Sequence, residues 1–188
     1  MGLQERGWFT FCDFRITSPV MYALKRLHPG SIEQALEKAD HYRELNQPEE
    51  AESICRDVLA VSANQPGALK LLGLALTDQF PTAWMRVFDE ALAIFERLDT
   101  EYERVYYAGI AYERCAKAQL EHGQAHNAMV SFETALDFYG RAEQLAPPAA
   151  VADPILRWNR CVRMLTTHPE LRDVTGPARG TMHSVLGD

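Results

Sequence analysis

The chain has 188 residues, of which 47% are hydrophobic and 24% are charged, and its formal net charge is -7 at pH 7. A chain of this length and apolar content is expected to form one domain with a buried core rather than a disordered segment. The excess of acidic residues argues against binding to nucleic acid through phosphate attraction. No apolar run approaches the roughly 20 residues that cross a bilayer, so we expect no membrane-spanning helix and no membrane partner.

Residues 1–30 are expected to form an N-terminal arm and a short helix that ends near Leu27. Charged residues interrupt the first twenty positions, which argues against a signal peptide and makes the cytoplasm the expected location. Bulky apolar residues without a clean period also occur there, from Trp8 to Ile16. Two interpretations stay open: the stretch is an extended arm packed on the domain, or Met21 is the true start.

Residues 31–146 repeat one helical pattern three times. Small residues recur on the first helix of each unit, at Ala39, Gly73 and Gly109, where they allow a neighbouring helix to approach closely. A second apolar series follows in each unit, with internal spacings of four and then three residues that define one face of a helix. Its members are Ala51, Cys55 and Val58, then Trp84, Phe88 and Ala91, then Ala128, Phe132 and Ala135. Each unit is therefore predicted to be helix, turn, helix.

Turn and capping residues stand at the places that such units require. Asn46 and Gly123 tolerate the positive φ that closes a helix, while Gln79 is less suited to the corresponding turn. Ser31 and Thr100 each precede a Gln or Glu by three residues, which is the spacing of a capping box. The third unit is longer than the first by about two helical turns, so we expect the hairpin around Gly123 to project beyond its neighbours.

A further helix is predicted at 153–166, after two prolines that end the third unit. Its apolar side should hold Ile155, Trp158, Val162 and Leu165, whereas Arg157, Arg160 and Arg163 should lie largely towards water. This helix would cap the exposed end of the repeats. Residues 167–188 contain several glycines and prolines and are expected to form a flexible tail.

The repeat pattern resembles the tetratricopeptide repeat family over about Ile32 to Leu145, and matches it best from Asn46 to Leu76. It departs from the family at Trp84, where alanine is usual, and in the long third unit. The resemblance implies an all-α fold, specifically an α-solenoid of antiparallel helix pairs. Such a solenoid winds as a right-handed superhelix, here with a C-terminal capping helix, and its concave surface binds partners.

In this family the first helix of each unit lines the concave groove, so the resemblance assigns groove residues by position. The assigned residues are Glu33, Glu37, Asp40 and Glu44 from the first unit, Lys70, Leu74 and Asp78 from the second, and Glu103, Tyr106, Tyr107, Ile110 and Glu113 from the third. An acidic surface with an aromatic and aliphatic strip suits a peptide or helix that carries Lys or Arg beside apolar anchors. The alternative is an ordinary solvated face, with the tyrosines packed between helices.

The implied function is that of a non-catalytic protein-interaction scaffold or adaptor. Two alternatives remain: a dedicated cytoplasmic chaperone of the type III secretion kind, and an accessory or regulatory domain related to a larger enzyme. Self-association into a homodimer, through Trp84 or the N-terminal aromatic residues, is also left open.

The sequence offers no catalytic chemistry. It has no nucleotide-binding, zinc-protease or serine-hydrolase motif, so we expect neither an enzyme nor a cofactor. The four cysteines form no C-x-x-C pair and are expected to be free buried thiols. His122 and His126 are separated by the expected turn at Gly123, so they should not share a helix face and should not bind a metal.

Overall fold

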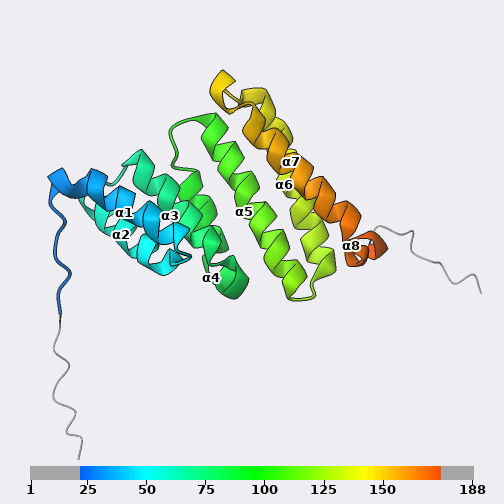
Figure 1. Cartoon of the computed structure of the whole chain (residues 1–188), viewed down its shortest axis with the longest axis horizontal. Coiled ribbons are helices and arrows are strands. Elements are labelled where there is room, and N and C mark those ends of the chain that lie inside the picture. The colour runs from blue at the N-terminus through cyan, green and yellow to red at the C-terminus, as the bar shows by residue number, and fades with distance from the viewer. Residues whose placement is uncertain (1–21, 175–188) are drawn as a thin grey trace, which may run out of the picture.

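The computed structural model describes residues 22–174, and their side chains as far as residue 171 (Figure 1). All regular structure in this range is helical, with no strand, as the periodicity predicts. The 3-10 helices are η1 (Pro29–Ser31) and η2 (Pro148–Ala150). The α-helices are α1 (Ile32–Glu44), α2 (Pro48–Val61), α3 (Pro66–Asp78), α4 (Phe80–Phe95), α5 (Glu101–Glu121), α6 (Ala125–Leu145), α7 (Ala152–Thr167) and α8 (Pro169–Val174).

Each helix from α1 to α8 packs against the next helix along the chain. Contacts also join α1 to α3 and α3 to α5, and α8 touches α6 as well as α7. The helices therefore succeed one another across the molecule, from α1 at one end to α7 and α8 at the other (Figure 1). The third pair is the longest, because α5 and α6 have 21 residues each, whereas α1 and α3 have 13.

The predicted turn residues close two of the helix connections. Asn46 has a φ of 57° and Gly123 a φ of 73°, in the left-handed region that favours Asn and Gly. Gln79 keeps a negative φ of -83°, so α4 begins directly after it without such a turn. Thr100 caps α5 as predicted, because its hydroxyl accepts from the Glu103 backbone N–H at 3.1 Å. The capping box predicted at Ser31 is wrong, since Ser31 makes no side-chain cap bond.

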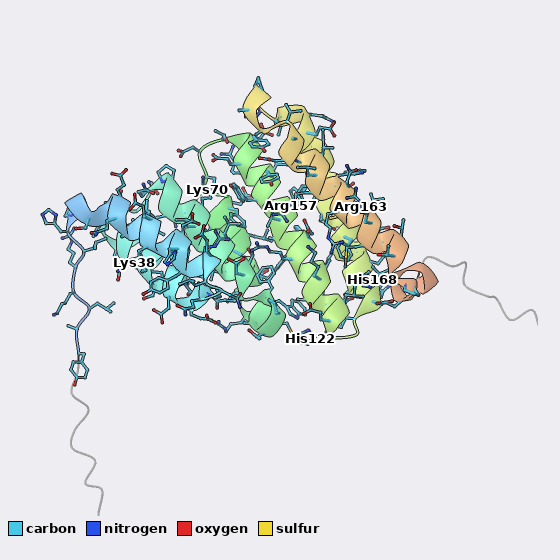
Figure 2. All side chains as sticks on the ribbon, viewed as in Figure 1. Lys38, Lys70, His122, Arg157, Arg163 and His168 are labelled. Carbon is cyan, nitrogen blue, oxygen red and sulfur yellow. The ribbon has the colours of Figure 1, made fainter. Side chains whose placement is uncertain are left out.

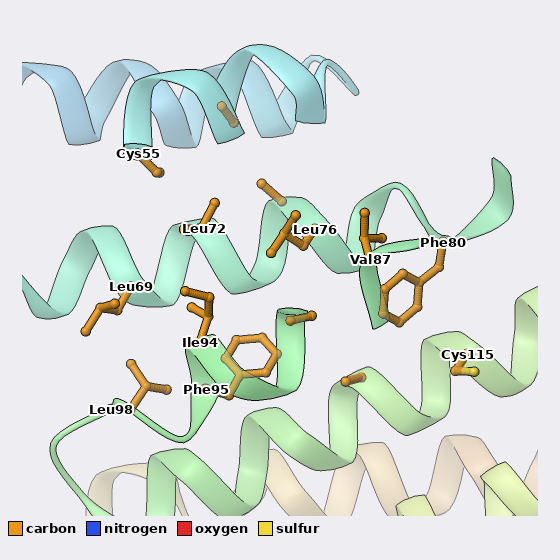
Figure 3. Close-up of a cluster of buried hydrophobic side chains, with 14 of the residues drawn as sticks. Cys55, Leu69, Leu72, Leu76, Phe80, Val87, Ile94, Phe95, Leu98 and Cys115 are labelled. Atoms are coloured by element: carbon orange, nitrogen blue, oxygen red, sulfur yellow. The ribbon is translucent and has the colours of Figure 1, made fainter. Parts of the chain in front are cut away.

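The core consists of two clusters of buried side chains. The first gathers residues of α1 to α5 around α3, as Figure 3 shows for Leu72, Leu76 and Phe95. The second joins α5 and α6 to α7 and α8 through Phe132, Tyr139 and several smaller residues. Burial of these apolar side chains supplies the main favourable term in folding.

Two of the predicted small residues lie at close contacts between the helices of one pair. A Cβ added at Gly73 of α3 would lie 2.2 Å from Cε1 of Phe95 on α4. A Cβ at Gly109 of α5 would lie 2.8 Å from Cε1 of Tyr139 on α6. In each pair, therefore, an aromatic ring of the second helix rests directly on the backbone of the first.

The C-terminal part differs from the prediction in two respects. Helix α7 buries Pro154, Cys161 and Met164, whereas of the predicted side only Leu165 packs against the second cluster and Ile155, Trp158 and Val162 remain 37%, 39% and 38% exposed. Both residue sets have helical spacing, so the sequence pattern alone selected the wrong face.

The expected tail and N-terminal helix also need correction within the described range. Part of the predicted flexible tail forms α8, whose Leu171 is 1% exposed and packs in the second cluster. Residues 22–28 form no helix, contrary to the expectation of one ending near Leu27. The predicted arm at residues 1–21 and the rest of the tail lie outside the described residues. Within residues 22–174, no helix combines the length and the apolar character needed to span a membrane.

Candidate functional site

The four acidic residues assigned to the first unit lie together on the surface of α1. Glu33, Glu37, Asp40 and Glu44 are spaced by four, three and four residues, so they share one helix face, and all four are exposed. Asp40 is 3.4 Å from Nη1 of Arg43, an exposed pair of small energetic weight. The predicted acidic surface is therefore present on this helix as a stripe of carboxylates.

The acidic residue of the second unit is engaged within the protein. Oδ2 of Asp78 accepts from Nε of Arg43 at 2.8 Å, and Oδ1 accepts from Nη1 of Arg114 on α5. Nη1 of Arg114 also donates to Oγ1 of Thr77 at 2.6 Å. Burial lowers the pKa of Arg114, an effect that Asp78 opposes. Asp78 thus links α1, α3 and α5 and has little charge left for a partner.

The remaining residues assigned to α3 are half-buried. Leu74 packs against both core clusters, and Lys70 lies on the same helix (Figure 2). Lys70 takes part in no ion pair among the described residues.

The tyrosines assigned to the third unit are half-buried and pack mainly against other rings. Tyr106 stacks on Tyr102 with ring centroids 5.6 Å apart, and Tyr107 stacks on Phe95 at 5.3 Å. Burial raises the pKa of Tyr107 to about 12, so its hydroxyl stays protonated at neutral pH. Glu103 accepts a hydrogen bond from Thr100 and belongs to the cap of α5. The aromatic strip is therefore only partly available to a partner.

Ile110 and Glu113 do not belong to an exposed surface, so their assignment to the groove is wrong. Ile110 is 3% exposed and Glu113 is 0% exposed, because α6 and α7 cover this side of α5. The Glu113 carboxylate accepts from the Tyr139 hydroxyl at 2.7 Å and from Nζ of Lys117. Nη1 of Arg157 lies 3.6 Å from the same carboxylate, which places α7 against α5.

The ionisation of Glu113 depends on these neighbours. Burial alone would raise the pKa of the carboxyl group, but the Lys117 ammonium, the hydrogen bonds from Lys117 and Tyr139, and Arg157 together hold the pKa below its ordinary value. The partners of this buried carboxylate lie on α5, α6 and α7, so Glu113 connects these three helices. Arg157 was expected to face water and instead lies next to the Glu113 carboxylate, whereas Arg163 is exposed as predicted (Figure 2), and so is Arg160.

Two surface hollows flank the C-terminal half of α5, and sequence reasoning did not find them. One, of about 270 Å³, lies against α3 and α4 and includes Asp78, Pro81 and Arg114. The other, of about 350 Å³, lies against α7 and α8 and includes Arg160 and His168. Lys117 and Glu121 of α5 line both. The only sequence signal for the first was that Asp78 and Arg114 hold equivalent positions of successive units with opposite charge.

The cysteines and histidines form no reactive cluster among residues 22–174. Cys55, Cys115 and Cys161 are free and buried, which confirms the prediction for these three thiols, whereas Cys12 lies outside the described residues. No group of three or more His, Cys, Asp or Glu side chains in the described part of the chain is arranged to hold a metal ion. The Nδ1 atom of His122 is 2.8 Å from the Ala118 carbonyl oxygen.

No family model, no curated protein and no solved structure matches this chain. The resemblance to tetratricopeptide repeats therefore stays a prediction from the residues.

Proposed function

We propose that α1 to α6 are three helix–turn–helix units of the tetratricopeptide type, arranged as an α-solenoid of antiparallel pairs and capped by α7. Three features support the proposal: the helix bounds, the left-handed turn residues Asn46 and Gly123, and the close contacts at Gly73 and Gly109. The contacts of α1 with α3 and of α3 with α5 are those expected if first helices line one face.

On this fold, the protein is a non-catalytic interaction scaffold or adaptor that binds a peptide or helix along the face formed by α1, α3 and α5. The observation that carries the proposal is the exposed carboxylate stripe of Glu33, Glu37, Asp40 and Glu44 on α1. Asp78 and Glu113 are paired with basic side chains within the protein, whereas all four carboxylates of the stripe are exposed to a partner.

The partner is accordingly a segment whose basic residues meet α1 and whose apolar residues meet the half-buried Leu74 and Tyr107. Charge complementarity of this kind mainly accelerates association and selects the partner, and its effect falls with added salt. Three free buried thiols support a reducing compartment, and we propose the cytoplasm.

The proposal is tested by reversing charge on the stripe. Tagged wild-type protein and the Glu37→Lys, Asp40→Lys double variant are used to capture partners from the source cell, which are identified by mass spectrometry. A matched control carries Asp89→Lys in α4 and Glu96→Lys directly after it, two exposed acids with the same total charge change. Circular dichroism verifies that all three proteins are folded.

A partner that wild type and the α4 variant retain, and that the α1 variant loses, supports an adaptor working through the acidic stripe. Equal retention by all three proteins removes this surface from the function. Capture of a secreted, hydrophobic client would instead favour the chaperone alternative. Catalytic turnover of a substrate by the purified protein would favour the alternative of a domain related to a larger enzyme.

A further inference from the structure

Exposed apolar side chains are concentrated at one place in the fold, away from the acidic stripe. Of eleven exposed large hydrophobic residues in the described part of the chain, six lie between Leu145 and Val162. Four of these have the spacing of one helix face: Val151, directly before α7, and Ile155, Trp158 and Val162 of α7 are separated by four, three and four residues. We refer to these four residues as the α7 stripe.

Among residues 22–174, helix α7 lacks a companion of its own length. Helices α1, α3 and α5 are each followed by a helix of 14 to 21 residues that packs against them. Helix α7 has 16 residues, and the helix that follows it, α8, has six. Figure 1 places α8 at the far end of α7, where Leu171 is buried, and the apolar residues Ile155, Trp158 and Val162 before that end stay 37%, 39% and 38% exposed.

The side of α6 that borders the α7 stripe is acidic. A Cβ at Gly140 of α6 would lie 3.4 Å from Cζ3 of Trp158, so this face of α6 adjoins the stripe. Three acidic residues of α6 share the face of Gly140, because their spacing from it is three or seven residues: Glu133, Asp137 and Glu143. All three are exposed, and none is in an ion pair among the described residues.

The other charged and polar groups near the α7 stripe make its two edges differ in charge. Arg141 of α6 lies over the Phe138 ring, 5.5 Å from its centroid, and Phe138 stacks on Tyr112 of α5, so Arg141 is directed away from α7. The free edge of the stripe on α7 carries the uncharged Asn159 and Thr166. Arg163 is exposed further round α7. One edge is therefore acidic and the other nearly neutral.

We propose that the α7 stripe and the acidic edge of α6 form a second interaction surface, which binds an amphipathic helix of another protein with basic residues along one edge. Such a helix would pack its apolar face on Ile155, Trp158 and Val162 in the position that a full-length companion of α7 would take. Trp158 is the central anchor, because large, half-buried aromatic side chains contribute most to such interfaces. Basic side chains on one edge of the ligand then pair with Glu133 and Asp137.

The test uses the full chain and an 18-residue fluorescein-labelled peptide of Leu and Lys, designed as an amphipathic helix with lysines along one edge. A second peptide has Glu in place of every Lys, and a third has the Lys peptide's composition in scrambled order. Fluorescence anisotropy measures the three affinities at low and moderate salt. We expect the Lys helix to bind at least ten times more tightly than the other two.

Variants locate the binding site. Ile155→Ser with Val162→Ser, and separately Trp158→Gln, should each weaken the Lys peptide at least tenfold. Glu133→Lys with Asp137→Lys should weaken it about fivefold or more and should strengthen binding of the Glu peptide. Met85→Ala, which removes an 80% exposed apolar side chain on α4, and Asp89→Lys with Glu96→Lys are the controls and should leave both affinities unchanged. Thermal melts verify that each variant is folded.

Three results would overturn the proposal. The first is equal affinity of all folded variants for the Lys peptide, or no binding to wild type. The second is a wild-type dimer in sedimentation that the Ile155→Ser, Val162→Ser variant loses, since a second copy would then occupy the stripe. The third is peptide binding that occurs only after residues 175–188 are deleted, since the chain's own segment would then be the occupant.

Discussion

The close contact between Gly73 and Phe95 makes a quantitative prediction for Gly73→Ala. The new Cβ would lie 2.2 Å from Cε1 and 2.7 Å from Cδ1 and Cζ of the Phe95 ring. Carbon atoms pack comfortably at roughly 3.5 Å, so the ring would have to retreat by about 1.3 Å. No free space surrounds the ring, because Phe95 is 1% exposed and stacks on Tyr107.

The expected loss of stability is the difference between two terms. Overpacking of a filled core costs about 1–3 kcal/mol, and a contact this short belongs at the upper end. Replacing Gly by Ala inside a helix gains about 1 kcal/mol. We therefore expect Gly73→Ala to lower the free energy of unfolding by about 2 kcal/mol, measured by urea denaturation followed by circular dichroism.

Two further variants make this reasoning refutable. Gly140→Ala, also inside a helix, meets only an ordinary 3.4 Å contact with Trp158 and should be neutral or stabilising by up to about 1 kcal/mol. Phe95→Leu removes the obstructing ring, so its combination with Gly73→Ala should show a favourable coupling of about 1 kcal/mol or more. If Gly73→Ala is as stable as wild type while Gly140→Ala behaves as expected, the contact does not limit the approach of α3 and α4.

Three other outcomes follow from the described contacts. Glu113→Gln should cost about 2 kcal/mol at neutral pH, because a buried carboxylate loses its charged hydrogen bonds. The pKa of Glu113 is held below its ordinary value of 4.5, so the stabilisation that its carboxylate contributes is complete above about pH 4.5 and is lost as the pH falls further. Urea unfolding at several pH values should therefore show that the stability of the Glu113→Gln variant falls less steeply at acidic pH than that of wild type. Thr100→Ala removes the cap of α5 and should lower stability by about 1 kcal/mol in the same assay; no change would mean that the Thr100–Glu103 bond has no energetic weight. Burial raises the thiol pKa to about 12 for Cys55 and Cys161 and to about 11 for Cys115. Iodoacetamide should therefore label these three thiols only under unfolding conditions, as read by peptide mass spectrometry. Rapid labelling of the native protein would contradict their burial.

The helical elements were predictable because their signals are local. Spacings of three and four residues, glycine or asparagine at a turn and proline at a first turn act within one helix or between neighbours. Gly73 and Gly109 were recognised in the same way, since a small residue at a repeated position marks a close approach.

The fate of individual charges was not predictable, because it depends on which helices meet. Nothing local distinguishes Glu37, which is exposed, from Glu113, which α6 and α7 bury. The face of α7 was missed for a related reason. Pro154, Cys161 and Met164 compete with Ile155, Trp158 and Val162, and only the position of α6 decides which set is covered.

Helix α5 has a consequence for how the molecule comes apart. Its Ala111, Cys115 and Ala118 belong to the first core cluster and its Ile110 and Ala116 to the second, while Leu74 and Tyr107 contact both. Helix α5 thus contributes side chains to both core clusters, and opening either cluster leaves the other with most of its own contacts. Native-state hydrogen exchange should therefore resolve two cooperative units, with the amides of α5 the slowest to exchange in both. A segment bound on α1 would then protect mainly the first unit, and a helix bound on α7 mainly the second.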